Sequence, residues 1–441
     1  MTQAAALLLL QVAAITVTAQ AVAYLLRRLG QPSVIGQLVA GIVLGASVFG
    51  ILAAPLQAAL FPAASLPVLK FVGQLGVVIY MFFIGFRMDH GSLRSHARGA
   101  VAVATAGAAV PLVSAGLFAI LIAGDHRFFP ARVAPFTAIL FFAAAMAVTA
   151  FPVMARIIDD RHLNGTRIAS IGLAAGSVSD VIAWCLLAVV LSSLAATAAG
   201  ALITIGGAVA FVLIALLPIR RLLRMLVESG AARRGPRGWT VLLVALLLLL
   251  AAVVSEKIGI HPAFGAFVLG AVVPRDGLVG RWPARLSALT VPVLLPVYFA
   301  YSGLNTRIGL ISSIGLILLT AVIIVVASVS KGVASATAAR LAGISTREAV
   351  AIGSLMNARG LVELVLLNTG LEKGVITPTL FSILVAMAVV TTFATSPILG
   401  LLYPRGTLPP GHEARDSRDG VEVLGHHVLV PDDDGESLLE K

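Results

Sequence analysis

The sequence predicts an all-α polytopic membrane protein with about 13 transmembrane helices, arranged as inverted repeats that contain two crossed, broken helices. Three observations support this prediction. Hydrophobic residues make up 59% of the 441-residue chain and charged residues only 12%, whereas soluble domains contain about 25% charged residues. Long apolar stretches recur along the chain, and two of them are interrupted by helix-breaking or strongly polar residues. The single cysteine, Cys185, excludes a disulfide framework and a cysteine metal site.

Thirteen apolar stretches are long enough, at roughly 17–25 residues each, to form transmembrane helices. They lie near residues 4–26, 33–53, 71–86, 99–123, 136–155, 168–193, 198–219, 239–254, 259–274, 288–304, 308–330, 348–367 and 377–403. No basic residue precedes the first stretch, and it is longer than the apolar region of about 7–15 residues in a signal peptide. We therefore expect it to be the first transmembrane helix.

The positions of Lys and Arg predict the orientation, because cytoplasmic loops of membrane proteins accumulate basic residues. With the N-terminus outside, the inner loops hold 19 Lys and Arg residues and the outer loops hold six. The net charge of +11 has the same origin and does not indicate nucleic-acid binding. Residues 404–441 are polar and rich in Pro and Gly, so we expect a mostly disordered cytoplasmic tail.

A polar loop at 220–239 divides the chain into two comparable halves, each with one interrupted apolar stretch. In the first half, AMAVTAFPVMARI (145–157) contains Pro152. In the second half, MNARGL (356–361) is the interruption. Halves that enter the membrane from opposite sides form inverted repeats, and secondary transporters place the binding site where the broken helices meet. The pattern therefore predicts an ion-coupled transporter.

Asp180 and Glu363 are the two carboxylates that lie inside the apolar stretches, away from their ends. An acid in hydrocarbon is costly, so it normally has an ionic function or a partner. Asp180 follows Ser179 in LAAGSVSDVIAWCLLAVV (173–190), a segment with many small residues. Because burial destabilises a charged carboxylate, a proton and a cation can compete for this group. The alternative is a structural ion pair with a basic residue on another helix.

Pro152 removes one backbone hydrogen bond and should break its helix near the middle. Carbonyl groups freed near Thr149, Ala150 and Phe151 could coordinate a dehydrated cation. The alternative is a simple kink that improves packing, which is common in membrane helices. The nearby Asp180 favours the functional interpretation.

Asn357, Arg359 and Glu363 form a second polar cluster. Arg359 and Glu363 are four residues apart and can share one helix face, which predicts an internal ion pair that supports the second broken helix. Direct cation binding by Glu363 is the alternative. Lys331 lies in the cytoplasmic half of its predicted helix, where it could extend to the interface or turn inward to pair with Asp180.

Several segments together resemble the cation:proton antiporter-2 family of monovalent cation/proton antiporters, whose membrane domain is similar to that of sodium/hydrogen exchangers. They are QPSVIGQLVAGIVLG (31–45), AVTAFPVMARIIDDRHLNGTRIASIGLAAGSVSDVIAWCLLA (147–188), GIHPAFGAFVLGAVVP (259–274), PVYFAYSGLNTRIGL (296–310) and KGVASATAARLAGISTREAVAIGSLMNARGLVELVLLNTGL (331–371). The resemblance covers residues 1 to about 403. It implies a sodium/proton antiporter-like fold and a homodimer. Core helices in about 99–193 and 308–403 would move against scaffold helices in about 1–86 and 239–304, and the helix at 198–219 would link them.

The resemblance also implies roles for individual residues. Asp180 matches the family's ion-binding aspartate, and Lys331 looks like the core lysine of some members. The cluster of Asn357, Arg359 and Glu363 matches the second family motif. In this chain Ser179 replaces the Asp or Asn that often precedes the aspartate, which leaves Lys331 without that extra carboxylate. In addition, Gln37 replaces an acid of the second helix, and we expect no nucleotide-sensing domain after residue 403.

We therefore predict a secondary active antiporter that exchanges protons for Na⁺ or K⁺ by an elevator-like movement. Asp180 is the expected shared proton and metal-ion site, supported by Ser179 and Thr149. One shared carboxylate predicts electroneutral exchange, whereas a titrating Lys331 would make exchange electrogenic. The alternatives are an ion-coupled symporter or exporter of an organic solute on the same fold, and a gated channel.

The remaining expectations concern chemistry and location. The sequence contains neither an HExxH motif nor paired catalytic aspartates on neighbouring helices. It therefore does not indicate an intramembrane enzyme. We expect no cofactor and no nucleic-acid partner, and we expect the lipid bilayer of the bacterial inner (plasma) membrane as the environment, with the C-terminus in the cytoplasm.

Overall fold

The computed structural model describes residues 3–87, 97–163, 166–193, 198–228, 237–274 and 290–404, and these residues form helices and turns without a β-strand. The helices longer than 20 residues are α1 (Gln3–Arg28), α5 (Leu66–Arg87), α7 (Ala97–Ile122), α10 (Arg167–Ser193), α14 (Arg237–Ile258), α18 (Ile314–Leu341) and α21 (Pro378–Leu402). The shorter α-helices are α2 (Ser33–Leu44), α3 (Phe49–Leu52), α4 (Ala54–Leu60), α8 (Pro135–Ala147), α9 (Phe151–Asp160), α11 (Ala198–Ile214), α12 (Arg220–Glu228), α15 (Pro262–Val272), α17 (Leu295–Leu304), α19 (Thr346–Met356) and α20 (Leu361–Glu372).

The predicted fold class is confirmed. Each of the thirteen apolar stretches coincides with one helix or with two consecutive ones, and short 3₁₀ or π turns at Ala63–Ser65, Ala215–Ile219, Thr290–Leu294 and Ile308–Leu310 adjoin them. Within the described ranges, ten helical segments are long and apolar enough to cross a membrane, and α15 is a shorter apolar helix. Two predicted segments lie outside the described residues: the tail from residue 405 onward and residues 229–236 of the polar loop.

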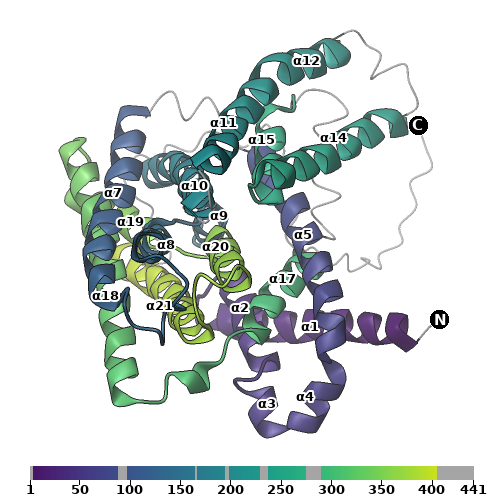
Figure 1. Ribbon diagram of the computed structural model, residues 1–441. Helices are drawn as coiled ribbons and strands as arrows, with labels where there is room; N and C mark the ends of the chain where they lie inside the picture. The colour runs from purple at the N-terminus through teal and green to yellow at the C-terminus, as the bar shows by residue number, and fades with distance from the viewer. Residues whose placement is uncertain are drawn as a thin grey trace, which may run out of the picture.

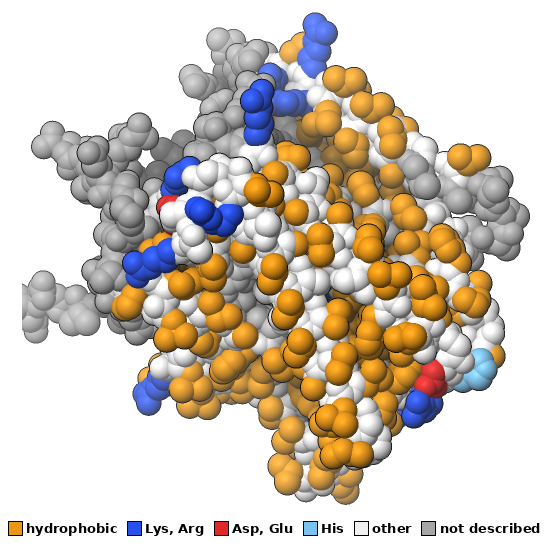
Figure 2. All heavy atoms as spheres, turned by 90° about the vertical axis from the view of Figure 1, so that its left-hand side faces the viewer, with side chains coloured by type: hydrophobic (Ala, Val, Ile, Leu, Met, Phe, Trp, Pro, Cys, Tyr) orange, Lys and Arg blue, Asp and Glu red, His pale blue; other side chains and the backbone are white. Residues whose placement is uncertain are grey.

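Apolar side chains cover the outside of the helix bundle. On α7 and α18 they include Leu117, Leu121, Leu318 and Val325, all of which are exposed. Figure 2 shows this face as a broad hydrophobic surface, with Lys and Arg side chains gathered mainly toward its margins. A surface of this kind is suited to lipid, and helices satisfy their own backbone hydrogen bonds in hydrocarbon.

One group of helices comprises α1, α2, α5, α15 and α17, with α14 packed on α15. Glycines allow the backbones in this group to approach closely. A Cβ atom on Gly41 of α2 would lie 2.6 Å from the Phe299 carbonyl oxygen of α17, and one on Gly270 of α15 would lie 2.0 Å from the Phe82 carbonyl oxygen of α5. The close crossings make this group a compact unit, seen on the right of Figure 1.

A second group contains α7, α8, α9, α10, α18, α19, α20 and α21, which Figure 1 shows around the centre and left of the molecule. It encloses the two broken helices: 83% of the apolar part of Pro135–Asp160 and 89% of that of Thr346–Glu372 are buried, against 22% for Ile314–Leu341. Irregular backbone at membrane depth is tolerated where protein surrounds it. The interrupted helices therefore lie where their freed backbone groups find partners.

Side-chain hydrogen bonds join the two groups. The Gln31 side-chain amide donates to the Phe393 carbonyl at 3.2 Å. The Asn368 amide donates to Ser302 Oγ at 2.7 Å. The roles of the two groups as scaffold and moving core stay a prediction.

Candidate functional site

The first broken helix consists of α8 and α9, which are joined by three residues with extended backbone at Val148 and Ala150. The predicted break is present, and at 148–150 it overlaps the residues near 149–151 where freed carbonyls were expected. Pro152 occupies the first turn of α9. A proline fits there because a backbone N–H at that position has no partner within the helix in any case. Pro152 thus starts the second half-helix.

The second broken helix consists of α19 and α20, and the break between them spans residues 357–360. The two breaks cross, because the Ala150 backbone N–H donates to the Ala358 carbonyl at 2.9 Å. A Cβ atom on Gly360 would lie 2.6 Å from Val153 Cγ2, so a glycine is needed where this backbone meets α9. The crossing predicted from the sequence is therefore confirmed by direct backbone contact.

Asp180 lies in α10 and its side chain points to the start of α9. Its Oδ1 accepts a hydrogen bond from the Phe151 backbone N–H at 3.3 Å, and the residue has no exposed surface. Its Oδ2 has no hydrogen-bond partner among the described residues. A helix N-terminus carries a partial positive charge that favours an anion. One carboxylate oxygen is thus held by the half-helix and the other is left available to a ligand.

Two further buried oxygens near Asp180 lack hydrogen-bond partners among the described residues. They are Thr149 Oγ1, in the break that precedes α9, and Ser179 Oγ, next to Asp180 in α10. Buried polar atoms are nearly always paired in proteins, so each exception needs an explanation. Thr149, Ser179 and Asp180 are residues that the sequence analysis singled out, and the packing of α10 against α8 and α9 brings their segments together.

Arg359 and Glu363 form the expected ion pair, with 3.4 Å between Nη1 and Oε1 and with both side chains fully buried. Arg359 lies in the break and Glu363 in the first turn of α20, so the pair spans the helix start instead of one continuous helix face. Glu363 Oε2 has no hydrogen-bond partner in the described part of the chain. Glu363 lies at the positive N-terminal end of its own half-helix, α20. Asp180 faces the corresponding end of α9.

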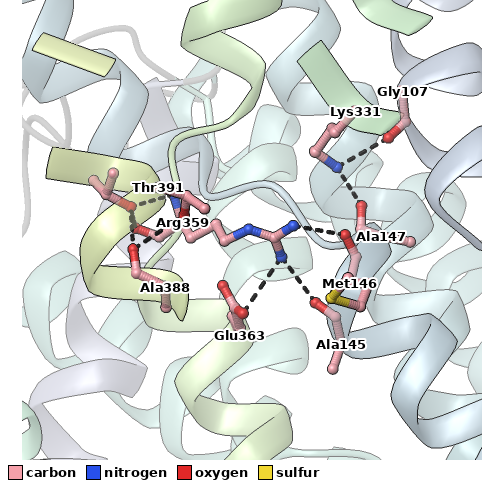
Figure 3. Close-up of polar contacts among 10 residues, drawn as sticks. Gly107, Ala145, Met146, Ala147, Lys331, Arg359, Glu363, Ala388 and Thr391 are labelled. Atoms are coloured by element: carbon pink, nitrogen blue, oxygen red, sulfur yellow. Dashed lines mark hydrogen bonds and ion pairs between the residues drawn. The ribbon is translucent and has the colours of Figure 1, made fainter. Parts of the chain in front are cut away.

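The side chains of Arg359 and Lys331 both reach the C-terminal end of α8 (Figure 3). Arg359 donates to the carbonyls of Ala145 at 3.0 Å and Met146 at 2.8 Å. Lys331 donates to the carbonyl of Ala147 and, at 3.0 Å, to that of Gly107 in α7. Two cations therefore occupy the negative end of a half-helix dipole, where positive charge is stabilised.

The position of Lys331 differs from both arrangements considered from the sequence. The residue is fully buried, so it does not extend to the interface. Its hydrogen-bond acceptors among the described residues are the two carbonyls and not Asp180. Sequence reasoning missed these partners because they are backbone groups.

Hydrogen bonds to α18 and α21 hold the second break. Thr392 Oγ1 accepts from the Arg359 backbone N–H at 2.8 Å, and beside it Thr391 Oγ1 donates to the Ala388 carbonyl at 3.2 Å (Figure 3). The Asn357 amide donates to the Ser328 carbonyl at 3.0 Å, so Asn357 ties the break to α18. The threonines were also missed, since hydroxyl residues are common in apolar helices.

Comparison with known proteins gives relatives over almost the whole chain. The family model for the transmembrane sodium/hydrogen exchanger matches residues 13–402. The Na(+)/H(+) antiporter NhaS4 of Synechocystis sp. is 33% identical over 400 residues, which cover 90% of this chain and 97% of that protein. The cation/H(+) antiporter 19 of Arabidopsis thaliana is 36% identical, with 90% of this chain and 50% of that protein covered.

The K(+)/H(+) antiporter 1 of Saccharomyces cerevisiae is 32% identical, with 90% and 47% covered. This chain thus spans about half the length of the plant and yeast relatives. The structure of the sodium proton antiporter MjNhaP1 from Methanocaldococcus jannaschii at pH 8 superposes with a TM-score of 0.61 over 90% of this chain and 98% of that one, at 15% identity. At that identity the superposition shows a shared fold.

The family match includes both broken helices, α10 and the helix that carries Lys331, and the shared fold agrees with it. The chain therefore belongs to the family of transmembrane sodium/hydrogen exchangers: it is an integral membrane protein that exchanges monovalent cations for protons, and it is not an enzyme.

Proposed function

We propose that Asp180 is the shared site at which a proton and a Na⁺ or K⁺ ion compete during exchange. The observation that supports this most directly is the buried Asp180 carboxylate, which has one oxygen held by the Phe151 N–H and the other without a partner among the described residues. The unpaired hydroxyls of Thr149 and Ser179 would add oxygen ligands for a dehydrated cation. Similar sites lie where broken helices cross in secondary transporters.

Glu363 and Lys331 have structural roles in this proposal. Glu363 is already paired with Arg359, and Lys331 with two carbonyls. Of the two carboxylates without exposed surface in the described spans, Asp180 and Glu363, Asp180 is the one that has no ion pair. One such carboxylate takes either one proton or one monovalent cation. Exchange should therefore be one-for-one and electroneutral, and no membrane potential should develop across liposomes during exchange.

The movement that carries Asp180 between the two faces is proposed to be elevator-like, with the group around the broken helices as the moving core and α1, α2, α5, α14, α15 and α17 as the scaffold. The protein is proposed to act as a homodimer in the bacterial plasma membrane, with its N-terminus outside and its C-terminus in the cytoplasm. The excess of Lys and Arg in the inner loops supports this orientation.

Dye-based measurement of proton movement in everted membrane vesicles tests the central proposal. Addition of Na⁺ or K⁺ should release protons from vesicles that contain the wild-type protein, and Asp180→Asn should reduce the rate to that of empty vesicles. Asp125→Asn is the matched control, since Asp125 lies in the loop after α7 and pairs with Arg127 at 2.5 Å. If Asp180→Asn exchanged at the control's rate at equal protein level, the proposed site would be wrong.

A further inference from the structure

Lys331 is held by a carbonyl that lies well inside a helix. In a regular α-helix the Gly107 carbonyl would accept a hydrogen bond from the backbone N–H of residue 111. Residue 111 is a proline within α7. Proline has no N–H, and its ring displaces the carbonyl four residues earlier. The carbonyl that accepts from Lys331 is therefore the one that Pro111 leaves without an intrahelical donor.

Gly107 contributes in a second way. A Cβ atom at this position would lie 2.4 Å from Ser335 Oγ, one turn after Lys331 in α18. The absence of a side chain at Gly107 thus lets α18 lie close against α7, with which it packs along its length (Figure 1). In the sequence GxxxP (107–111), Gly107 allows α18 to approach α7, and Pro111 leaves the Gly107 carbonyl free to accept a hydrogen bond.

The same arrangement occurs at another proline of this chain. Pro397 lies within α21, and the carbonyl four residues earlier is that of Phe393. This carbonyl accepts from the Gln31 side chain at 3.2 Å. In both helices a side chain from elsewhere replaces the donor that the proline removes, as the lack of water in a membrane interior demands.

We propose that Pro111 is a positioning residue for Lys331: it frees the Gly107 carbonyl, which directs the ammonium to the C-terminal end of α8 beside the crossing of the broken helices. The effect of the Lys331 position on exchange rests on the proposed function. The contact between Lys331 and the Gly107 carbonyl does not depend on it. Protein stability therefore tests the contact, and the exchange rate tests its effect on transport.

A double-mutant cycle in purified protein tests the coupling through Tm. In wild type, Pro111→Ala restores an N–H that competes with Lys331 for the Gly107 carbonyl. In a Lys331→Met background that carbonyl has lost its ammonium, and the restored N–H satisfies it. Pro111→Ala should therefore shift Tm more favourably in the Lys331→Met background, by about 2 °C or more. Lys331→Leu, which also lacks a donor, replaces Lys331→Met if the latter does not yield folded protein.

Pro397→Ala is the control, because its freed carbonyl is bound by Gln31 and should shift Tm equally in both backgrounds. In vesicles, Pro111→Ala with Lys331 present should lower the exchange rate about tenfold. Equal Tm shifts for Pro111→Ala in the two backgrounds would overturn the inference, and so would wild-type exchange by Pro111→Ala. If Asp180→Asn kept its activity, the proposed function would fail while the Tm coupling still tested the contact.

Discussion

Replacing Glu363 by Gln should destabilise the protein, because Arg359 would keep a buried charge and lose its carboxylate. The two side chains are fully buried, with 3.4 Å between the charged atoms. At an effective dielectric constant of about 20, unit charges at this distance attract each other by about 5 kcal/mol. The bonds from Arg359 to the carbonyls of Ala145 and Met146 remain. We therefore expect a net loss of about 3 kcal/mol, within the range for breaking buried ion pairs.

Thermal unfolding of the detergent-purified protein measures this loss, which corresponds to a fall in Tm of roughly 5–10 °C. Asp180→Asn is the contrasting variant. It removes a buried carboxylate for which the described residues provide a hydrogen bond from Phe151 but no ion pair, so its Tm should not fall. The reasoning is refuted if Glu363→Gln unfolds at the wild-type temperature, or if both variants lose the same stability.

Three further predictions concern the cation site, the crossing and the outer edge of the interface. A transported cation at 100 times its Kd should stabilise the wild type by about 2.7 kcal/mol and leave the Tm of Asp180→Asn unchanged; equal shifts would argue against this site. Gly360→Ala should cost about 1–3 kcal/mol, since its Cβ would lie 2.6 Å from a side-chain carbon of α9, whereas Gly124→Ala, with no atom within 4 Å of its Cβ, should be neutral by the same unfolding measurement. Glu372→Gln breaks a partly exposed salt bridge of 2.8 Å to Lys70. In denaturant titrations it should lower the free energy of unfolding by no more than about 1 kcal/mol. A larger loss would show that this contact is more than a surface ion pair.

The sequence predicted the helices and their breaks well because a bilayer imposes local requirements. A span needs about 20 apolar residues, and such stretches are visible without knowing their neighbours. The first break was expected near residues 149–151, just before Pro152, and lies at 148–150. Proline indicates that a helix is interrupted nearby, but it fits best in the first turn of the helix that follows. Its exact place depends on the Ala150–Ala358 contact between the two breaks.

The pairing of Arg359 with Glu363 was also predictable, since four residues of chain keep the two side chains within reach of each other. The packing decided what else they touch. Thr392 of α21 binds the Arg359 backbone, and the end of α8 accepts its guanidinium. Neither segment is near residue 359 in the chain.

The positions of the apolar helices, the two interruptions and the isolation of Asp180 from basic residues in its own segment follow from the sequence alone, because hydrocarbon makes apolar length and charge position local properties of a chain. The direction of the Lys331 side chain depends instead on how the helices pack. Its acceptors are carbonyls 224 and 184 residues away, one freed by Pro111 and one at the end of α8. Pro111 marks the Gly107 carbonyl as one without an intrahelical donor, but which side chain donates to it is known only when the helices are packed together.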